Sequence, residues 1–488
     1  MAPALERALN RHAHLGQRVA SGLRPLGWRT DVLFILGLSM ALANLGASSG
    51  DVQQQLIATL YGLLAGAAAL CWALRDPRLR ELPIGWLFGF GFVLRLISCA
   101  ASPLLEDDHW RYLWDGFRTF TTGSPYGLPP SAFFGVDALD PAMAVVLNGV
   151  NHPDVPTIYG PVLQALFAAA HAIEPGALWP IKGVLLLADM AVLLVLARMG
   201  VPCHWLLAYA VHPLVLREAM VSAHPDAMVG LFLLLAAQAW RANRAIRSGL
   251  WLGVAIASKV SALVAVPFLL MPAAAWAGSR AAPATRAAWA RWAMRVALAC
   301  GGLVAACYGY FLLQGGSDAP ALAVFSQTWR FNPLGYRLLE DALPGDWVRP
   351  TAGVLVALAL AVLLHRGWSR TLWRFGLPPL DCAVLALLLL SPVVNPWYWL
   401  WALPLAIACG RVALVAAAAV SAVAYLQIGV LQAAGWAEVT DLGGHAFAVP
   451  WPVAWVQVAV PAAVAWAVWR AHRDAPHIAH RVTHEPLP

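Results

Sequence analysis

The sequence predicts an all-α polytopic membrane protein, and three observations lead to this class. Hydrophobic residues make up 60% of the 488 positions and charged residues only 12%, whereas ordinary soluble domains carry about 25% charge. Apolar runs long enough to span a bilayer recur from residue 31 to residue 469. Basic side chains gather between these runs. The composition therefore excludes a soluble enzyme, a nucleic-acid-binding protein and a disulfide-stapled secreted module.

The apolar runs predict one membrane bundle of about 13 to 14 transmembrane helices. The run at 249–277 counts as two helices, because we expect a short hairpin with Lys259 at its apex. The segment 157–173 is expected to return to the outer face without crossing, since Pro and Gly crowd its start. The runs lie at 31–48, 54–73, 82–103, 178–199, 203–219, 225–241, 249–277, 291–313, 351–366, 378–394, 396–409, 411–432 and 450–469.

The orientation follows from the arginines. Of the 32 basic side chains 30 are arginine, and the two lysines, Lys182 and Lys259, lie inside apolar runs. The positive-inside rule places the basic clusters in the cytoplasm. If 157–173 and 249–277 each crossed the membrane once, the arginines at 198 and 241–247 would lie outside, so the charge rule favours the first arrangement. The clusters lie at 7–29, 75–80, 241–247, 280–295, 366–374 and 470–481.

This topology divides the chain into five parts. The stretch 104–156 carries seven acidic residues and two arginines, a net charge of −5, and is therefore expected outside the cytoplasm. The parts are a cytoplasmic N-terminal segment (1–30), N-terminal transmembrane helices (31–103), an extracytoplasmic loop with interfacial or half-embedded helices (104–177), a transmembrane bundle (178–469) and a cytoplasmic tail (470–488).

The outer loop opens with two carboxylates, Asp107 and Asp108, directly after the third span. An interfacial amphipathic helix is predicted next, because Trp110, Trp114 and Phe117 recur at i, i+4 and i+7. The two carboxylates either cap this helix, as aspartates commonly do, or have a function, since clustered carboxylates at a membrane surface are unfavourable unless they are paired or used.

Other polar and aromatic residues recur at the outer ends of later runs. A lone lysine such as Lys259 costs about 2.5–3.5 kcal/mol in an apolar run, so we expect it to have a partner or a function. Arg217 and Glu218 form either a local ion pair or part of a site, and the aromatic residues around Trp397 belong either to an interfacial belt or to a site. The further polar candidates are His224, Asp226, Arg330, Asn332, Asn395 and Tyr398.

The seven cysteines are scattered singly through apolar segments, without a spacing that suits zinc. We therefore expect no metal site and no other cofactor, and dependence of an activity on a divalent metal stays open.

Several motifs occur together: Asp-Asp-x-x-Arg-Tyr-x-Trp-Asp-Gly at 107–116, Gly-Ser-Pro-Tyr at 123–126, a Pro- and Tyr-containing run at 153–161, Lys259 followed by Pro267, Arg-Phe-Asn at 330–332 and Ser-Pro-x-x-Asn-Pro-Trp-Tyr at 391–398. This set resembles the membrane-embedded type C glycosyltransferases, above all bacterial polyprenyl-phosphate-mannose-dependent mannosyltransferases of glycosyltransferase family 87. The resemblance covers about residues 95–400 and is most specific in the acidic loop. It departs from the family in two extra spans before that loop and in Asn395, where many relatives have His.

The resemblance implies a hexosyltransferase in which Asp107 is the general base and Asp108 its neighbour. The chemistry agrees, because the attacking hydroxyl must lose a proton whereas a phosphate leaving group needs none. A cation is wanted at the departing phosphate, for which Lys259, Arg330 and Arg217 are candidates. The expected substrate-binding residues are Arg111, Tyr112, Trp114, Asp115, Tyr159, Glu218, His224, Asp226, Asn332, Asn395, Trp397 and Tyr398.

The implied partners are a polyprenyl-phosphate sugar donor, with mannose as the expected sugar, a lipid- or glycan-linked acceptor and the lipid bilayer, but no nucleic acid. A single displacement would invert the anomeric centre. The expected location is the bacterial cytoplasmic membrane, with both termini in the cytoplasm and the site outside it. A polytopic transporter of lipids or small molecules is the main alternative, since it too has embedded charges and broken helices. A ligase that joins a lipid-linked glycan to a carrier is the other.

Overall fold

The computed structural model describes residues 28–75, 79, 81–136, 139–272, 285–368, 376–427, 446–447 and 451–474. Most of the predicted N-terminal segment, the tail after residue 474 and the ends of the runs at 249–277 and 411–432 lie outside these residues. The described part is nearly all-α. Its two strands, β1 (Arg330–Phe331) and β2 (Ala446–Phe447), are two residues each and pair in parallel.

Apolar helices identify the described part as a helical membrane protein. Five helices are long and apolar enough to cross a bilayer, or six if the bent pair η3 (Val215–Val221) and α10 (Asp226–Arg241) is one span. Shorter apolar helices of 10–17 residues occupy much of the remaining apolar sequence. The class predicted from composition is confirmed at this level, and the count of 13 to 14 spans stays a prediction.

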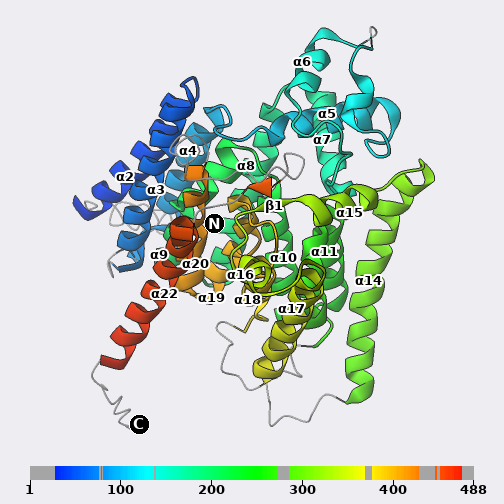
Figure 1. The fold of residues 1–488 in the computed structure, drawn as a ribbon. Helices are drawn as coiled ribbons and strands as arrows, with labels where there is room; N and C mark the ends of the chain where they lie inside the picture. The colour runs from blue at the N-terminus through cyan, green and yellow to red at the C-terminus, as the bar shows by residue number, and fades with distance from the viewer. Residues whose placement is uncertain are drawn as a thin grey trace, which may run out of the picture.

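The N-terminal helices form one side of the bundle (Figure 1). Arg95 of α4 is fully buried and forms an ion pair with Asp189 of α8, and the Tyr209 hydroxyl of α9 donates to the same carboxylate at 2.5 Å. Because a buried charge is stable only when it is paired and hydrogen-bonded, this cluster fixes how the three helices pack. These helices are α2 (Trp28–Ala47), α3 (Val52–Arg75), α4 (Ile84–Ala100), α8 (Trp179–Arg198) and α9 (Cys203–Ala210).

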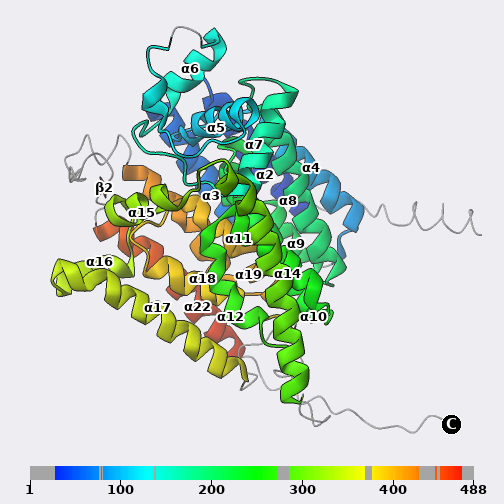
Figure 2. The same cartoon turned by 90° about the vertical axis from the view of Figure 1, so that its right-hand side faces the viewer.

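Helices of the acidic loop lie together at one end of the bundle, as both views show (Figures 1 and 2). Helices α5 and α7 approach so closely that a Cβ atom at Gly116 would lie 2.4 Å from the carbonyl oxygen of Phe167. The predicted aromatic stripe is not open to its surroundings, because Trp114 is 2% exposed and packs against Phe117 and Phe133. The elements are α5 (Asp108–Thr122), η2 (Pro130–Phe133), α6 (Pro141–Gly149) and α7 (Pro161–Ile173).

The chain turns back at Lys259, as the sequence predicted. Lys259 contacts Asp226 at the start of α10, and Trp240 near the end of α10 donates to the Met271 carbonyl at 2.6 Å. The returning arm therefore runs back along α10, but six of its residues are 3₁₀ rather than α-helical. Helix α14 packs along the first arm (Figure 2). The elements are α11 (Ala245–Ser258), η4 (Val260–Ala265), α12 (Val266–Leu269) and α14 (Arg286–Leu313).

Prolines divide several predicted spans in the second half of the bundle. The run at 203–219 breaks because α9 ends before Pro213 and a π-helical turn follows. The run at 396–409 begins as a 3₁₀ helix and becomes α-helical around Pro404. The remaining elements are α15 (Ala319–Thr328), α16 (Gly335–Ala342), α17 (Gly345–Trp368), α18 (Leu380–Leu389), η5 (Pro396–Trp401), α19 (Leu403–Cys409), α20 (Val412–Val420), η6 (Ser421–Gln427) and α22 (Trp451–Asp474).

Candidate active site

A cavity of about 410 Å³ lies where the start of α5, the loop before α7, the hairpin turn and the start of η5 meet; we call it the acidic cavity. Volumes of this order are typical of small-molecule sites. The predicted site residues that line it are Asp107, Asp108, Arg111, Tyr159, Lys259, Asn395, Trp397 and Tyr398.

The two aspartates do not cap α5. Asp107 occupies the N-cap position, yet its side chain makes no capping hydrogen bond with the helix. Instead the amide of Asn151 donates to Asp107 Oδ1 at 2.6 Å and to Asp108 Oδ1 at 2.9 Å. The Tyr159 hydroxyl donates to Asp108 Oδ2 at 3.2 Å. Asp108 thus accepts from side chains through both of its oxygens, whereas Asp107 accepts from a side chain of the described residues through Oδ1 only.

Reduced solvation and the close spacing of carboxyl groups change the pKa values of Asp107 and Glu106. The pKa of Asp107 is raised above its ordinary value, first by reduced solvation in the cavity and then by the neighbouring charge of Asp108. The pKa of Glu106, which also lines the cavity, is raised well above its ordinary value for the same two reasons. A carboxylate with a raised pKa holds a proton more readily at neutral pH, which suits a general base.

Arg111 holds the far wall instead of reaching for a ligand. Its guanidinium donates to the backbone carbonyls of Asn151, His152 and Val155, each at 3.0 Å. These bonds fix the loop that presents Asn151 to the aspartates. Close packing fixes the other end of this wall, because a Cβ atom at Gly160 would lie 2.3 Å from the Ala257 carbonyl oxygen at the end of α11.

Lys259 supplies the cation of the cavity. Its ammonium lies 2.8 Å from Asp226 Oδ1, which also accepts from the Trp401 indole at 2.7 Å. It faces the rings of Tyr398 at 4.6 Å, Trp401 at 5.2 Å and Tyr159 at 5.9 Å from their centroids. The side chain is 13% exposed, so one edge of the charge reaches the cavity. A partner for the lone lysine was expected, and Asp226 is that partner.

His224 lies behind Asp108 and is fully buried. Its Nε2 is 3.9 Å from Asp108 Oδ2, and its Nδ1 is 3.0 Å from Glu218 Oε2, at an angle outside that of a hydrogen bond. The ring stacks on Trp397 with centroids 3.9 Å apart. Glu218 accepts in turn from the Tyr425 hydroxyl. His224 and Glu218 therefore do not line the cavity, but they place charge and packing directly behind its wall.

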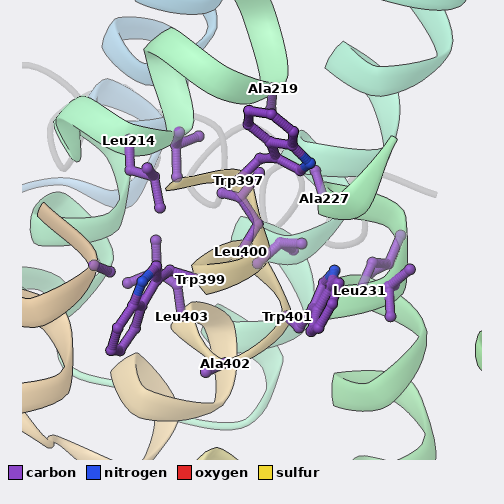
Figure 3. Close-up of a cluster of buried hydrophobic side chains, with 14 of the residues drawn as sticks. Leu214, Ala219, Ala227, Leu231, Trp397, Trp399, Leu400, Trp401, Ala402 and Leu403 are labelled. Atoms are coloured by element: carbon purple, nitrogen blue, oxygen red, sulfur yellow. The ribbon is translucent and has the colours of Figure 1, made fainter. Parts of the chain in front are cut away.

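Among the tryptophans of η5, Trp397 lines the acidic cavity, and Trp399 and Trp401 are buried in the core. Figure 3 shows Trp397 pointing towards Ala219 and Ala227, and Trp401 pointing towards Leu231. All of these side chains are buried, and Trp397 is 6% exposed where it meets the cavity. The aromatic residues therefore belong to the core and the site, which corrects the alternative that they form an interfacial belt.

Three predicted ligands of the sugar or phosphate face away from the acidic cavity. Arg330 Nε pairs with Glu340 at 2.5 Å, and Asn332 exchanges hydrogen bonds with Gln457. Arg217 is buried and donates to Thr59 and to the Leu104 carbonyl instead of pairing with its neighbour Glu218. Each of these side chains bonds to a partner outside the acidic cavity. The predicted phosphate contacts of Arg330 and Arg217 therefore have no support in the geometry.

Three predicted residues on α5 are likewise packed into the protein. Tyr112 and Trp114 are buried among aromatic rings. Asp115 accepts from Gln164 at 3.1 Å, and burial raises the pKa of this carboxyl to about 6. The sequence placed these residues on a helix beside the aspartates. In the structure Tyr112 and Asp115 contact α7, and Trp114 contacts Phe133 of η2.

Residues that sequence reasoning did not select complete the cavity. The signals were present, because Glu106 adjoins the aspartate pair and Asn151 opens the proline-rich run. Two of the lining residues, Leu105 and His152, have positive φ angles of 60° and 44°, an uncommon conformation for residues other than Gly that often marks functional sites. The residues concerned are Leu105, Glu106, Asn151, His152, Val155, Pro156, Thr157, Ile158, Phe325, Trp329 and Phe331.

Among the described residues, no group of three or more His, Cys, Asp or Glu side chains has the arrangement of a metal site. No protein-family model, no curated protein and no solved structure matches the chain. Function is therefore inferred from the sequence motifs and from the chemistry of the acidic cavity.

Proposed function

We propose that this protein is a membrane glycosyltransferase of the type C kind, which moves a sugar from a polyprenyl-phosphate donor to a lipid- or glycan-linked acceptor. The observation that carries the proposal is the composition of the acidic cavity. One wall presents three carboxylates, another a lysine, and Tyr159 links them, because its hydroxyl bonds Asp108 and its ring faces Lys259.

The charges assign an orientation to the donor. Asp107 and Asp108 repel an anionic phosphate, so the phosphate belongs on the side of Lys259 and the sugar lies between the two walls. The rings of Trp329, Tyr398 and Phe331 offer apolar surface for the C–H face of a sugar. The polyprenyl chain stays in the bilayer, next to the apolar helices.

The proposed reaction is one displacement. The acceptor oxygen forms a bond to C1 of the sugar while the bond from C1 to the phosphate oxygen breaks, and the electron pair leaves with the phosphate. Asp107, with its raised pKa and free oxygen, takes the acceptor hydroxyl proton. Lys259 stabilises the charge that grows on the leaving phosphate, and the carboxylates stabilise the positive charge on the sugar ring. The product has the opposite anomeric configuration.

The test is transfer by purified protein in lipid vesicles that contain a labelled polyprenyl-phosphate sugar and a lipid and glycan extract. Removing a general base commonly lowers the rate about 10²–10⁴-fold, so Asp107→Asn should lose transfer to that extent. Asp154→Asn removes the same charge from an exposed position of the same loop, outside the cavity lining, and should keep it. Asp108→Asn should lose less than Asp107→Asn.

Three outcomes would overturn the proposal or a part of it. Near-normal turnover of folded Asp107→Asn would remove Asp107 as the base, and loss in Asp108→Asn alone would move the base by one residue. Movement of the labelled lipid across the vesicle membrane without any sugar transfer would favour the transporter.

A further inference from the structure

A second cavity, of about 550 Å³, lies at the opposite end of the hairpin from the acidic cavity; we call it the arginine pocket. It is formed by the turn from α10 into α11, by Pro272 after the returning arm, and by the first turns of α14. Helix α11 has 14 residues, so about 20 Å of helix separates its two ends and the two cavities. Neither the sequence motifs nor the proposed transfer reaction uses this second cavity.

Four arginines line the arginine pocket: Arg244, Arg247, Arg291 and Arg295. Its described lining includes no acidic side chain, and in the described part of the chain no carboxylate lies within ion-pair distance of any of the four. All four side chains are exposed, and without a carboxylate partner in the described part of the chain they favour an anion in this concave site. Their planar forks suit the oxygens of a phosphate.

Exposed apolar side chains continue beyond the arginines on both helices, and one of them, Ile246, also lines the pocket. Ile246 and Leu250 on α11 are 57% and 41% exposed, and Met294 and Leu298 on α14 are 62% and 69% exposed. Each pair is spaced i, i+4, so each forms a strip that leads away from the arginines along its helix. Helices α11 and α14 pack against each other, which places the two strips on neighbouring helices. A free phosphate would bind the arginines without covering these apolar strips.

We propose that the arginine pocket binds the headgroup of an anionic phospholipid, with the acyl chains along the strips of α11 and α14. The phosphodiester is held by the four guanidinium groups, and the lipid belongs to the leaflet at the end of the bundle opposite the acidic cavity. Basic pockets between membrane helices commonly bind such headgroups. A soluble anion or an acidic peptide explains the charge, but neither explains the apolar strips beside it.

The test uses the purified full chain in nanodiscs of phosphatidylcholine with about 10–20% phosphatidylglycerol. Native mass spectrometry measures the lipid that the protein retains, and thermal unfolding measures its stabilisation as lipid is titrated. Each arginine at an anionic surface contributes about fivefold, so Arg291→Gln/Arg295→Gln should weaken phosphatidylglycerol binding about 30-fold. The control Arg241→Gln/Arg286→Gln removes two exposed arginines nearby that do not line the pocket, and it should keep the affinity.

Further measurements distinguish a lipid headgroup from a soluble anion as the ligand of the arginine pocket. Arg291→Lys/Arg295→Lys keeps the charge that orients the protein in the membrane and loses the bidentate fork, so it should weaken binding by less than the Gln pair. Inorganic phosphate and glycerol phosphate should neither stabilise the protein nor displace the lipid. Equal loss in the control pair, unchanged binding in the Gln pair, or stabilisation by inorganic phosphate alone would each overturn the proposal. None of these measurements depends on sugar transfer.

Discussion

The pair of Lys259 and Asp226 offers a quantitative test of how the hairpin turn is held. Asp226 is 1% exposed, and its Oδ1 accepts from Lys259 and from Trp401. Removing one partner of a buried ion pair commonly costs about 3–5 kcal/mol, because the other charge is left without compensation. Lys259→Met leaves Asp226 with the Trp401 indole only, and since Lys259 is 13% exposed we expect the lower end, about 3 kcal/mol.

Asp226→Asn should cost less. Lys259 then keeps its contacts with the Tyr398 and Trp401 rings and its open edge to the cavity, so we expect about 1–2 kcal/mol. In the double variant neither charge is left alone. The combined cost should therefore fall short of the sum of the single costs by about 0.5–3 kcal/mol, as is usual for residues in contact.

The assay is equilibrium unfolding in mixed micelles, followed by tryptophan fluorescence. The other lysine provides the matched control, because Lys182 donates to the backbone carbonyls of Cys99 and Ala101 and has no contact with Asp226. Lys182→Met and Asp226→Asn should be additive within about 0.5 kcal/mol. Equally additive costs for Lys259→Met and Asp226→Asn would refute the ion pair as the support of the turn. Donor binding gives a second readout, since it should weaken in Lys259→Met and persist in Asp226→Asn, where the lysine is freed.

Two further predictions concern pH. Because the pKa of Glu106 is raised in the folded protein, the folded state binds more protons than the unfolded state between the two pKa values, and stability falls as pH rises through that window. Glu106→Gln should therefore be more stable than the native protein at pH 7.5, and a less stable variant would contradict the reasoning. Asn151 donates to Asp107 and lowers its pKa, so Asn151→Ala should move the acid limb of the pH–rate profile to higher pH; a limb that stays in place would show that Asp107 does not set it. The charges that face Glu106 are Asp107, Asp108, Glu218 and Arg217.

The sequence predicted the class of the protein, the turn at Lys259 and the meeting of the aspartates with the runs at 151–161 and 391–398. These predictions rest on local rules: apolar runs make helices, prolines interrupt them, and a lone charge needs a partner. Partners far apart in the chain follow no such rule. Arg95 and Asp189 are 94 positions apart and lie in different runs, so no local pattern pairs them.

The same limit explains the errors in the predicted site. Arg330 stands in a plausible outer motif, but α16 brings Glu340 to it, and the arginine turns away from the acidic cavity. On α5, the family resemblance implies substrate contacts for Trp114 and Asp115, but periodicity shows only which residues share a face and not which face the neighbouring helices cover. The choice of face depends on the packing of α6 and α7, which lies 20 or more residues further along the chain.

The short first arm of the hairpin has a consequence for how a lipid donor would be used. About 20 Å of α11 lies between the acidic cavity and the arginine pocket, whereas the hydrocarbon core of a bilayer is about 30 Å thick. In the proposed membrane placement, with the arginines at one surface, the acidic cavity would lie below the opposite one. Moving a polyprenyl chain from the bilayer into water would cost a free energy of about 0.8 kcal/mol for every CH₂ group exposed. A cavity below the surface would receive the phosphate without drawing the polyprenyl chain into water. The proposed transferase would then act on its donor within the bilayer, and the acceptor hydroxyl would have to move from the surface to the cavity.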